Sequence, residues 1–285
     1  MAAPVLFRKM HGLGNDFVVV DTRAHPFALS AAAARSIANR RTGIGFDEML
    51  LIEHPRNGGD AFMGVRNADG SVSASCGNGA RCVASLLMTE LGKDRIVLET
   101  GAGPVIAWQA ENDQIAVDMG PALLGWREIP LREERDTLHL GIGLGALQDP
   151  VGVSMGNPHA VFFVADAQAI DLAALGPKLE HDALFPDRAN IEVVQVIDRG
   201  HLRMRVWERG SGITMACGTG ACAVGVAAAR RGLTDRSMTV TLDGGDLQIL
   251  WRDDGHVVMT GPVAESFTGV IDPSLLSASA AGAAA

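Results

Sequence analysis

The chain contains one pattern of residues twice, in two halves of similar length. Corresponding landmarks in the two halves are separated by about 142 positions. Chance does not keep so many landmarks in one register over 285 residues, so we interpret the chain as two copies of one domain. The paired landmarks are Asn15 with Asn157, Glu48 with Asn190, Asn67 with Glu208, Cys76 with Cys217, Trp108 with Trp251, and Gly120-Pro121 with Gly261-Pro262.

Each copy consists of short predicted strands and one markedly apolar predicted helix. Residues 17–21, 49–53 and 62–66 predict strands, and Ser30 predicts the N-cap of a helix that runs through Arg41. Residues 221–229 have no polar face, so their helix must be buried on all sides.

These features predict an α+β fold of two pseudo-symmetric domains. Each domain is expected to be a mostly antiparallel sheet wrapped around a central buried helix, with the active site in the cleft between the domains. The expected bounds are residues 1–119, with a returning strand at about 264–272, for the first domain and residues 120–263 for the second. Residues 273–285 are almost entirely small or apolar and predict a disordered tail.

The two cysteine motifs each stand just before a predicted helix. Cys76-Gly-Asn-Gly precedes a helix over residues 78–91, and Cys217-Gly-Thr-Gly precedes a helix over residues 219–231. Free N–H groups and the helix dipole favour an anion at such a position. We therefore expect these thiols to lose a proton more readily than an ordinary cysteine, whose pKa is about 8.5. A single copy would more simply be a buried cysteine beside a tight turn, but the duplication favours a paired site.

Two facing helix ends suit an amino-acid substrate. Amides at Gly77-Asn78 and Gly218-Thr219 can hold its α-carboxylate, which places the α-carbon between the two sulfurs. One thiolate then removes the α-proton, and the opposite thiol delivers a proton to the other face. No lysine has a setting that suggests pyridoxal phosphate, and Lys9, Lys93 and Lys178 all read as surface residues. We expect no cofactor.

Composition excludes several other classes of function. The chain has 24 basic and 33 acidic residues and a net charge of −9, which argues against nucleic acid or an anionic membrane as a partner. No apolar run is long enough to cross a bilayer, and the first residues do not resemble a signal peptide, so we expect a cytoplasmic protein. The four cysteines are too few for a disulfide framework and too widely spaced for a zinc site. The oligomeric state stays open, and a homodimer is compatible with the sequence.

Several motifs together resemble the diaminopimelate epimerase family. The likeness extends from Leu6 to about Ile271. It implies cofactor-independent interconversion of LL- and meso-2,6-diaminopimelate, on the route to lysine and, in bacteria, to peptidoglycan. The motifs are Lys9-Met-His-Gly-Leu-Gly-Asn-Asp-Phe-Val, Asn67-Ala-Asp-Gly-Ser, Cys76-Gly-Asn-Gly-Ala-Arg-Cys, Met155-Gly-Asn-Pro-His, Glu208-Arg-Gly and Ala216-Cys-Gly-Thr-Gly-Ala-Cys.

The resemblance also implies roles for individual residues. Cys76 and Cys217 become the acid-base pair, and His159 and Glu208 lie beside the thiols, where they influence protonation or hold the reacting amino group. Arg209 suits the distal carboxylate because its guanidinium is a planar fork. The implied substrate contacts are Asn15, Glu48, Asn67, Gly77, Asn78, Asn157, Asn190, Glu208, Arg209, Gly218 and Thr219.

Two positions depart from the family pattern. Glu48 stands where the family more often has Gln, so its contact with the substrate is the least secure of the set. Trp207 replaces a common Tyr, and we expect it to pack inward. Cys82 and Cys222 are expected to be core residues.

Two other functions remain open at this point. A proline racemase-like enzyme would use the same two thiols on a smaller amino acid, but the amide and Arg side chains suit a second charged end. A phosphate- or nucleotide-binding module is disfavoured because neither Gly-x-Gly is followed by Lys-Ser/Thr. The asparagines, taken singly, are ordinary turn or cap residues, and the Glu208-Arg209 pair could be a surface ion pair.

Overall fold

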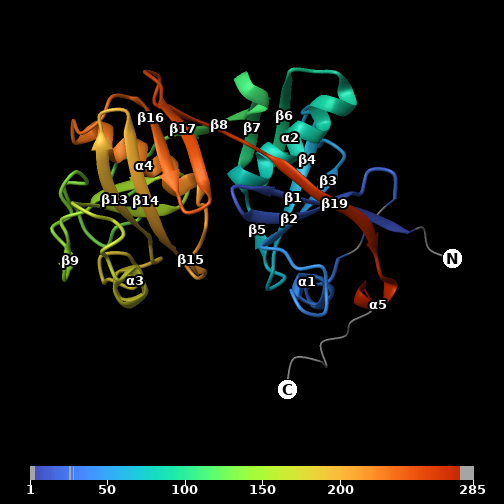
Figure 1. Ribbon diagram of the computed structural model, residues 1–285, viewed down its shortest axis with the longest axis horizontal. Coiled ribbons are helices and arrows are strands. Elements are labelled where there is room, and N and C mark those ends of the chain that lie inside the picture. Colours follow the sequence, from blue (N-terminus) through green and yellow to red (C-terminus); the bar gives the residue numbers. More distant parts are fainter. Residues whose placement is uncertain (1–3, 26, 28, 277–285) are drawn as a thin grey trace. The chain divides into compact units, whose positions relative to one another are not determined.

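The computed structural model describes residues 4–25, 27 and 29–276, and the chain folds into two compact units. The first unit comprises the described residues up to Val117 and from Pro262 onward, and the second comprises residues 118–261. Strand β8 (Ile115–Pro121) leads from the first unit into the second, and β19 (Ala264–Ile271) follows the second unit (Figure 1). Among the described residues, no helix is both long and apolar enough to span a membrane.

The first unit is built on one sheet with the order β19–β1–β2–β3–β4–β6–β7. The short strand β5 (Val72–Ser73) pairs with β4, and the helices are α1 (Ala31–Ala38) and α2 (Gly77–Leu91). Helix α2 packs on five strands of this sheet, β1, β2, β3, β6 and β7. The other strands are β1 (Val5–Gly12), β2 (Asn15–Asp21), β3 (Glu48–Glu53), β4 (Ala61–Asn67), β6 (Arg95–Thr100) and β7 (Gly103–Gln109).

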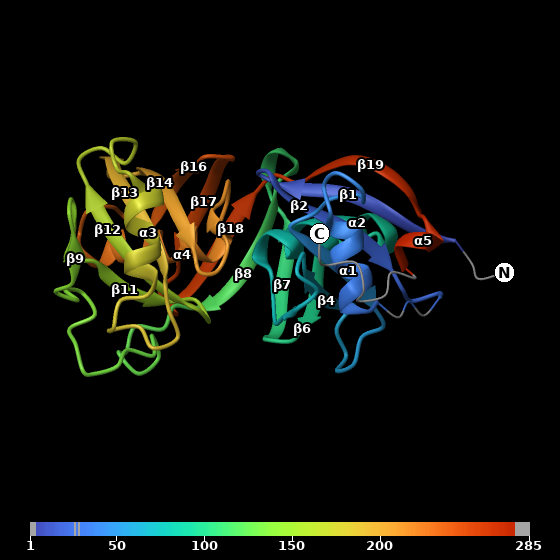
Figure 2. The same cartoon turned by 90° about the horizontal axis from the view of Figure 1, so that it is seen from below.

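The second unit has a matching sheet with the order β11–β12–β13–β14–β16–β17–β18. Helix α4 (Gly218–Arg230) packs on all seven strands, whereas α3 (Leu172–Glu180) packs on β13, β14 and the short β15 (Gly212–Ile213) (Figure 2). A small hairpin joins β9 (Gly143–Leu144) to β10 (Leu147–Gln148). The sheet strands are β11 (Val151–Ser154), β12 (Pro158–Val164), β13 (Asn190–Asp198), β14 (His201–Glu208), β16 (Ser237–Leu242), β17 (Gly245–Trp251) and β18 (His256–Gly261).

The pairing pattern confirms the internal repeat. In the first unit β1–β2 is antiparallel, β2–β3 parallel, β3–β4 antiparallel, β4–β6 parallel and β6–β7 antiparallel. In the second unit β11–β12, β12–β13, β13–β14, β14–β16 and β16–β17 follow the same series. The predicted α+β class, with a mostly antiparallel sheet around a helix in each unit, is therefore confirmed.

The central helices lie within one residue of their predicted bounds, 78–91 and 219–231. Cys76 and Cys217 are the N-caps of α2 and α4. Gly92 ends α2 in the left-handed conformation, at φ 63°, which glycine adopts without strain. The α4 residues from Ala221 to Ala228 are all buried, as the absence of a polar face required. Cys82 and Cys222 are buried core residues, which confirms their predicted packing role.

Three local predictions were wrong. Helix α1 has the predicted Ser30 cap but ends at Ala38, because the Asn39 side chain accepts hydrogen bonds from the backbone N–H groups of residues 41 and 42 and forms a turn instead. Lys9 is 8% exposed and is not a surface residue. The segment Pro273–Leu276 forms a short helix, α5, where the tail was expected to be disordered, and residues 277–285 of that tail lie outside the described residues.

The close packing of α4 predicts that it tolerates no added volume. A Cβ on Gly225 would lie 2.8 Å from Ile249 Cγ2 and 2.8 Å from Met238 Sδ. We expect Gly225→Val to lower the free energy of unfolding by about 1–3 kcal/mol because the core must shift to accept it. Urea denaturation measures this loss. Ala174→Val, on the exposed face of α3, should stay within about 0.5 kcal/mol of wild type, and an equal loss in both variants would contradict the packing account.

Candidate active site

Cys76 caps the N-terminus of α2 through its sulfur. The Sγ atom accepts a hydrogen bond from the Gly79 backbone N–H at 3.3 Å. The cap residue is extended, at φ −146° and ψ 110°, so the chain enters the helix at the cysteine. A Cβ on Gly79 would lie 2.9 Å from Leu50 Cδ2. A larger residue at this position would displace the Leu50 side chain, so glycine favours the close approach of the helix end to β3.

Four of the predicted substrate contacts lie together in this unit. Asn78 Nδ2 donates to Asn15 Oδ1 at 3.1 Å, and Asn15 Nδ2 donates to Glu48 Oε2 at 3.0 Å. Glu48 is the cross-strand partner of Asn67 in the antiparallel β3–β4 pair. Asn67 in turn donates to the Ser71 hydroxyl at 2.9 Å. The structure thus joins Asn15, Glu48, Asn67 and Asn78 into one polar cluster.

A fully buried cation, Arg81, determines how the amide groups of this cluster are oriented. Arg81 Nη1 donates to Asn78 Oδ1 at 3.0 Å, and Arg81 is fully buried. Because a guanidinium can only donate, the Asn78 oxygen must face Arg81 and its nitrogen must face Asn15. The same logic turns the Asn15 nitrogen toward carboxylates, where it also donates to Asp47 Oδ2 at 3.0 Å.

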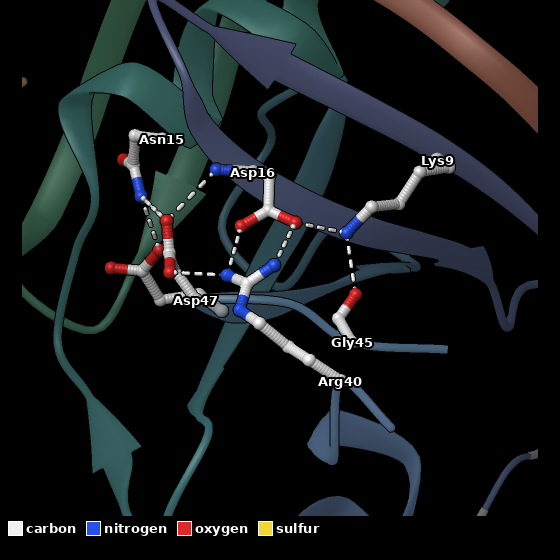
Figure 3. A network of polar contacts seen from close by, with 7 residues as sticks. Lys9, Asn15, Asp16, Arg40, Gly45 and Asp47 are labelled. Atoms are coloured by element: carbon white, nitrogen blue, oxygen red, sulfur yellow. Dashed lines mark hydrogen bonds and ion pairs between the residues drawn. The ribbon is translucent and has the colours of Figure 1, made fainter. Parts of the chain in front are cut away.

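A network of charged side chains lies beside Asn15, which donates to Asp47 (Figure 3). The Arg40 guanidinium lies between two carboxylates, 2.6 Å from Asp16 Oδ1 and 2.7 Å from Asp47 Oδ1. Lys9 donates to Asp16 and to the carbonyl of Gly45. Burial opposes the charge on Asp16, but the contacts with Arg40 and Lys9 outweigh it and lower the pKa of Asp16 to about 2.

Cys217 repeats the cap in the second unit. Its Sγ accepts from the Gly220 backbone N–H at 3.3 Å, and the Thr219 hydroxyl lies 3.6 Å from the sulfur. A Cβ on Gly220 would lie 2.9 Å from Met204 Cε and 3.0 Å from Glu192 Oε1. In both units the third residue after the cysteine is thus a glycine that packs closely against its neighbours, and its backbone N–H donates to the sulfur.

The electrostatic setting of Cys217 differs from the prediction. Burial, followed by the carboxylates of Glu208 and Glu192, raises the pKa of the Cys217 thiol well above its ordinary value. Hydrogen bonds with Thr219 and Gly220 act in the opposite direction but do not compensate. The expectation of a lowered pKa was therefore wrong for this thiol, because the helix end is closed to water and faces acidic side chains.

Glu208 is held beside Cys217. The Thr214 hydroxyl donates to Glu208 Oε1, and the Glu208 carboxylate lies close enough to the Cys217 thiol for each group to shift the pKa of the other. Burial raises the pKa of Glu208, and the nearby charge of Glu192 adds to the rise, although the bond from Thr214 opposes it. A carboxyl and a thiol in contact, both disposed to keep a proton, can exchange that proton.

His159 is connected to Cys217 through Asn157 and Thr219. Asn157 Nδ2 lies 3.3 Å from Thr219 Oγ1, and Asn157 Oδ1 lies 3.0 Å from His159 Nε2. On the other side, His159 Nδ1 lies 2.6 Å from Glu192 Oε1, and both of these side chains are fully buried. The ring is therefore held from both nitrogens.

Asn190 and Arg209 complete the second cluster. Asn190 is the parallel-strand partner of His159, and its Nδ2 donates to the carbonyl of Pro158 at 3.1 Å. Its Oδ1 accepts from the Arg209 backbone N–H at 2.8 Å, and Arg209 Nη1 donates to the carbonyl of Asp187 at 3.0 Å. The structure thus brings together all the predicted residues of the second half: Asn157, His159, Asn190, Glu208, Arg209, Cys217, Gly218 and Thr219.

Sequence reasoning missed the residues that hold these side chains in place. They include Arg40, Asp47, Arg81 and Glu192. A charged residue inside an apolar strand, as Glu192 is in β13, was the available signal, because such a residue is buried only with a partner. Among the described residues, no group of three or more His, Cys, Asp or Glu side chains could hold a metal ion.

Solved structures with a similar fold define the general class. A phenazine biosynthesis protein of the PhzF family from Bacillus anthracis aligns with a TM-score of 0.68 at 17% identity and covers 95% of this chain and 99% of that one. A hydroxyproline epimerase from Agrobacterium vitis, solved with bound trans-4-hydroxy-L-proline, aligns with a TM-score of 0.67 at 15% identity and covers 95% and 93%. The protein therefore has the two-unit, epimerase-like fold.

Sequence similarity narrows this class to one family. The family model named diaminopimelate epimerase matches residues 7–124 and 151–265. A diaminopimelate epimerase of Rhodospirillum centenum is 57% identical over 271 residues, 95% of this chain and 93% of that one. Another, of Acidiphilium cryptum, is 52% identical over 276 residues, 97% and 99%. The chain belongs to the diaminopimelate epimerase family, as its motifs predicted.

The Asp16 network predicts a loss of stability in acid. The pKa of Asp16 is lowered in the folded protein from 3.8 to about 2, so its contribution is complete above about pH 4 and is lost as the pH falls toward 2. We expect Asp16→Asn to lower the free energy of unfolding by about 2 kcal/mol at neutral pH. The gap between variant and wild type should narrow between pH 4 and 2 in urea denaturation. Asp253→Asn, at a fully exposed site, is the control, and a constant gap for Asp16→Asn would contradict the assignment.

Proposed function

We propose that this protein is an isomerase that interconverts LL- and meso-2,6-diaminopimelate without a cofactor. The observation that carries the proposal is the duplicated cysteine cap, in which a sulfur sits at the N-terminus of a buried helix in each unit. Membership of the diaminopimelate epimerase family supports the substrate. The reaction would belong to lysine biosynthesis and, in bacteria, to peptidoglycan precursor synthesis.

The helix ends supply binding groups for the reacting carboxylate. The cap sulfurs take the N–H groups of Gly79 and Gly220, which are the third residues after each cysteine. The first two amides of each helix, at Gly77-Asn78 and Gly218-Thr219, belong to the turn whose N–H groups have no partner within the helix. A carboxylate bound by these donors would be stabilised further as negative charge spreads onto it during proton removal.

The two thiols divide the proton transfer. Inversion requires the sulfurs on opposite faces of one α-carbon. A thiolate takes the α-proton, the electron pair stays on the carbon and its carboxylate, and the opposite thiol gives its proton to the other face and becomes the thiolate. The raised pKa of Cys217 favours Cys217 as the proton donor in the resting enzyme, with Cys76 as the base, and the roles reverse for the opposite direction.

The remaining predicted residues suit the distal end of the substrate. Diaminopimelate carries an ammonium and a carboxylate at each end. Amide and carboxylate oxygens of Asn15, Glu48, Asn67 and Asn157 are suitable acceptors for the ammonium group. Arg209 is the cation suited to the distal carboxylate. We also propose a cytoplasmic location, because the chemistry needs Cys76 and Cys217 as thiols and the cytosol keeps thiols reduced.

A comparison of substrates tests this assignment. A proline racemase-like activity would use the same pair of thiols, but nothing in proline would need Arg209. We expect turnover of LL-diaminopimelate in a coupled assay and none of proline under the same conditions. Turnover of proline alone would overturn the proposal.

The cysteines should be needed individually. We expect Cys76→Ser and Cys217→Ser each to lower kcat by at least about 100-fold, because a hydroxyl is a far weaker acid than a thiol. Cys82→Ala is the matched control: Cys82 is buried, and burial raises its pKa to about 12, so it keeps its proton. This control should retain its kcat while losing some stability. A Cys217→Ser variant with a near-normal rate would show that Cys217 is not the acid.

A further inference from the structure

We propose that Glu180, at the end of α3, is a positioning residue for Arg209. This inference rests on the proposed function, in which Arg209 binds the distal carboxylate of the substrate. Glu180 does not belong to any sequence motif of the site and lies on a helix that carries none of the predicted site residues. It acts through the turn that follows β14.

The Glu180 carboxylate accepts hydrogen bonds from residues on both sides of Arg209, Trp207 and Gly210. One oxygen, Oε2, accepts from the indole Nε1 of Trp207 at 2.7 Å, and the other, Oε1, accepts from the backbone N–H of Gly210 at 3.0 Å. Arg188 Nη1 lies 3.2 Å from Oε1 and balances the charge. Glu180 is 3% exposed, so these contacts form away from water, where a charge-assisted hydrogen bond is strong.

Trp207 links Glu180 to the turn because its ring packs against α3 at Gly176. A Cβ on Gly176 would lie 2.6 Å from Trp207 Cγ, so only glycine leaves room for the indole. Gly212, at φ 83°, lies beside the six-membered part of the ring, and a Cβ there would lie 3.6 Å from Trp207 Cη2. A tyrosine at position 207 would have its polar atom elsewhere and no indole N–H. Gly176 and the Glu180 carboxylate therefore fit the tryptophan of this chain.

Two further contacts hold Arg209 itself, and they differ from the anchor of its neighbour. The Arg209 backbone N–H is held by Asn190 and its Nη1 by the carbonyl of Asp187. Glu208, by contrast, has a separate anchor in Thr214. Glu180 holds the backbone of Gly210, which directly follows Arg209, whereas Glu208 is one residue further from that contact and keeps its bond from Thr214. Loosening Glu180 should therefore displace Arg209 more than the Glu208 carboxylate, and it should affect substrate binding more than the proton transfer.

The discriminating variant is Glu180→Gln, which keeps the shape of the side chain. Its amide places an NH₂ group, which cannot accept, at one of the two carboxylate oxygen positions, so it cannot hold Trp207 and Gly210 in their wild-type geometry. Displacement of a binding group by about 1 Å can cost up to about 100-fold. We expect the KM for LL-diaminopimelate to rise by about 10-fold, with kcat changed much less.

A double-mutant cycle shows whether the effect runs through Arg209. Arg209→Gln alone should raise KM strongly, and adding Glu180→Gln should then change kcat/KM little, because the displaced group is already absent. Glu99→Gln is the matched control. Glu99 also holds a loop by accepting backbone N–H groups, from Arg56, Asn57 and Gly59, so its loss should lower stability and leave KM unchanged.

The results separate this inference from the proposed function. A normal KM in Glu180→Gln, or fully additive effects with Arg209→Gln, would overturn the positioning role while wild-type turnover stands. Absence of wild-type turnover would overturn the proposed function instead. In that case NMR of the Trp207 indole N–H tests its hydrogen bond to Glu180 directly. A large upfield shift of this resonance in Glu180→Gln supports the hydrogen bond, and an unchanged resonance refutes it.

Discussion

Cys76 and Cys217 each accept a hydrogen bond from the backbone N–H three residues later, and much of each unit is arranged around that contact. The hydrogen bond from the backbone N–H helps to hold the position of each sulfur atom, in addition to the rotamer preference of the cysteine side chain. A glycine at the third position lets the helix end approach Leu50 in the first unit and Met204 in the second closely. Helix α4 packs on all seven strands of its sheet, and it is built almost wholly from small and β-branched apolar residues.

The two units share the cysteine cap but surround it with different polar side chains. The first unit surrounds Cys76 with amides whose directions are set by buried Arg81 and by the charged network of Arg40. The second buries Cys217 beside carboxylates, and burial, followed by the charges of Glu208 and Glu192, raises the pKa of its thiol. A two-base reaction needs one protonated and one deprotonated thiol at the start, so a difference between duplicated sites is useful. Divergence within the repeat thus affects the acid-base groups more than the backbone.

The sequence was sufficient for the features that depend on the local chain and on the repeat. Gly92, the apolar residues 221–229 and the paired landmarks predicted the central helices and the repeated domain. The sequence was insufficient where the register between strands determines which side chains come into contact. Glu192 meets His159 because parallel β12 and β13 place them on neighbouring strands. Lys9 is buried because Asp16 and a backbone carbonyl lie beside it. The pKa of Cys217 depends on Glu208 and Glu192 together, and no spacing in the sequence shows that both lie near one sulfur.

In the proposed reaction two separate groups exchange protons with one α-carbon, and isotope transfer in a single turnover distinguishes this from exchange with one group. LL-diaminopimelate labelled with deuterium at the α-carbons would be converted in ordinary water and stopped before the reverse reaction. Two thiols on opposite faces predict that meso product carries a solvent proton at the inverted carbon and retains no deuterium there. Substantial retention of deuterium at that carbon would mean that a single group removes and returns the proton, and the account would fail.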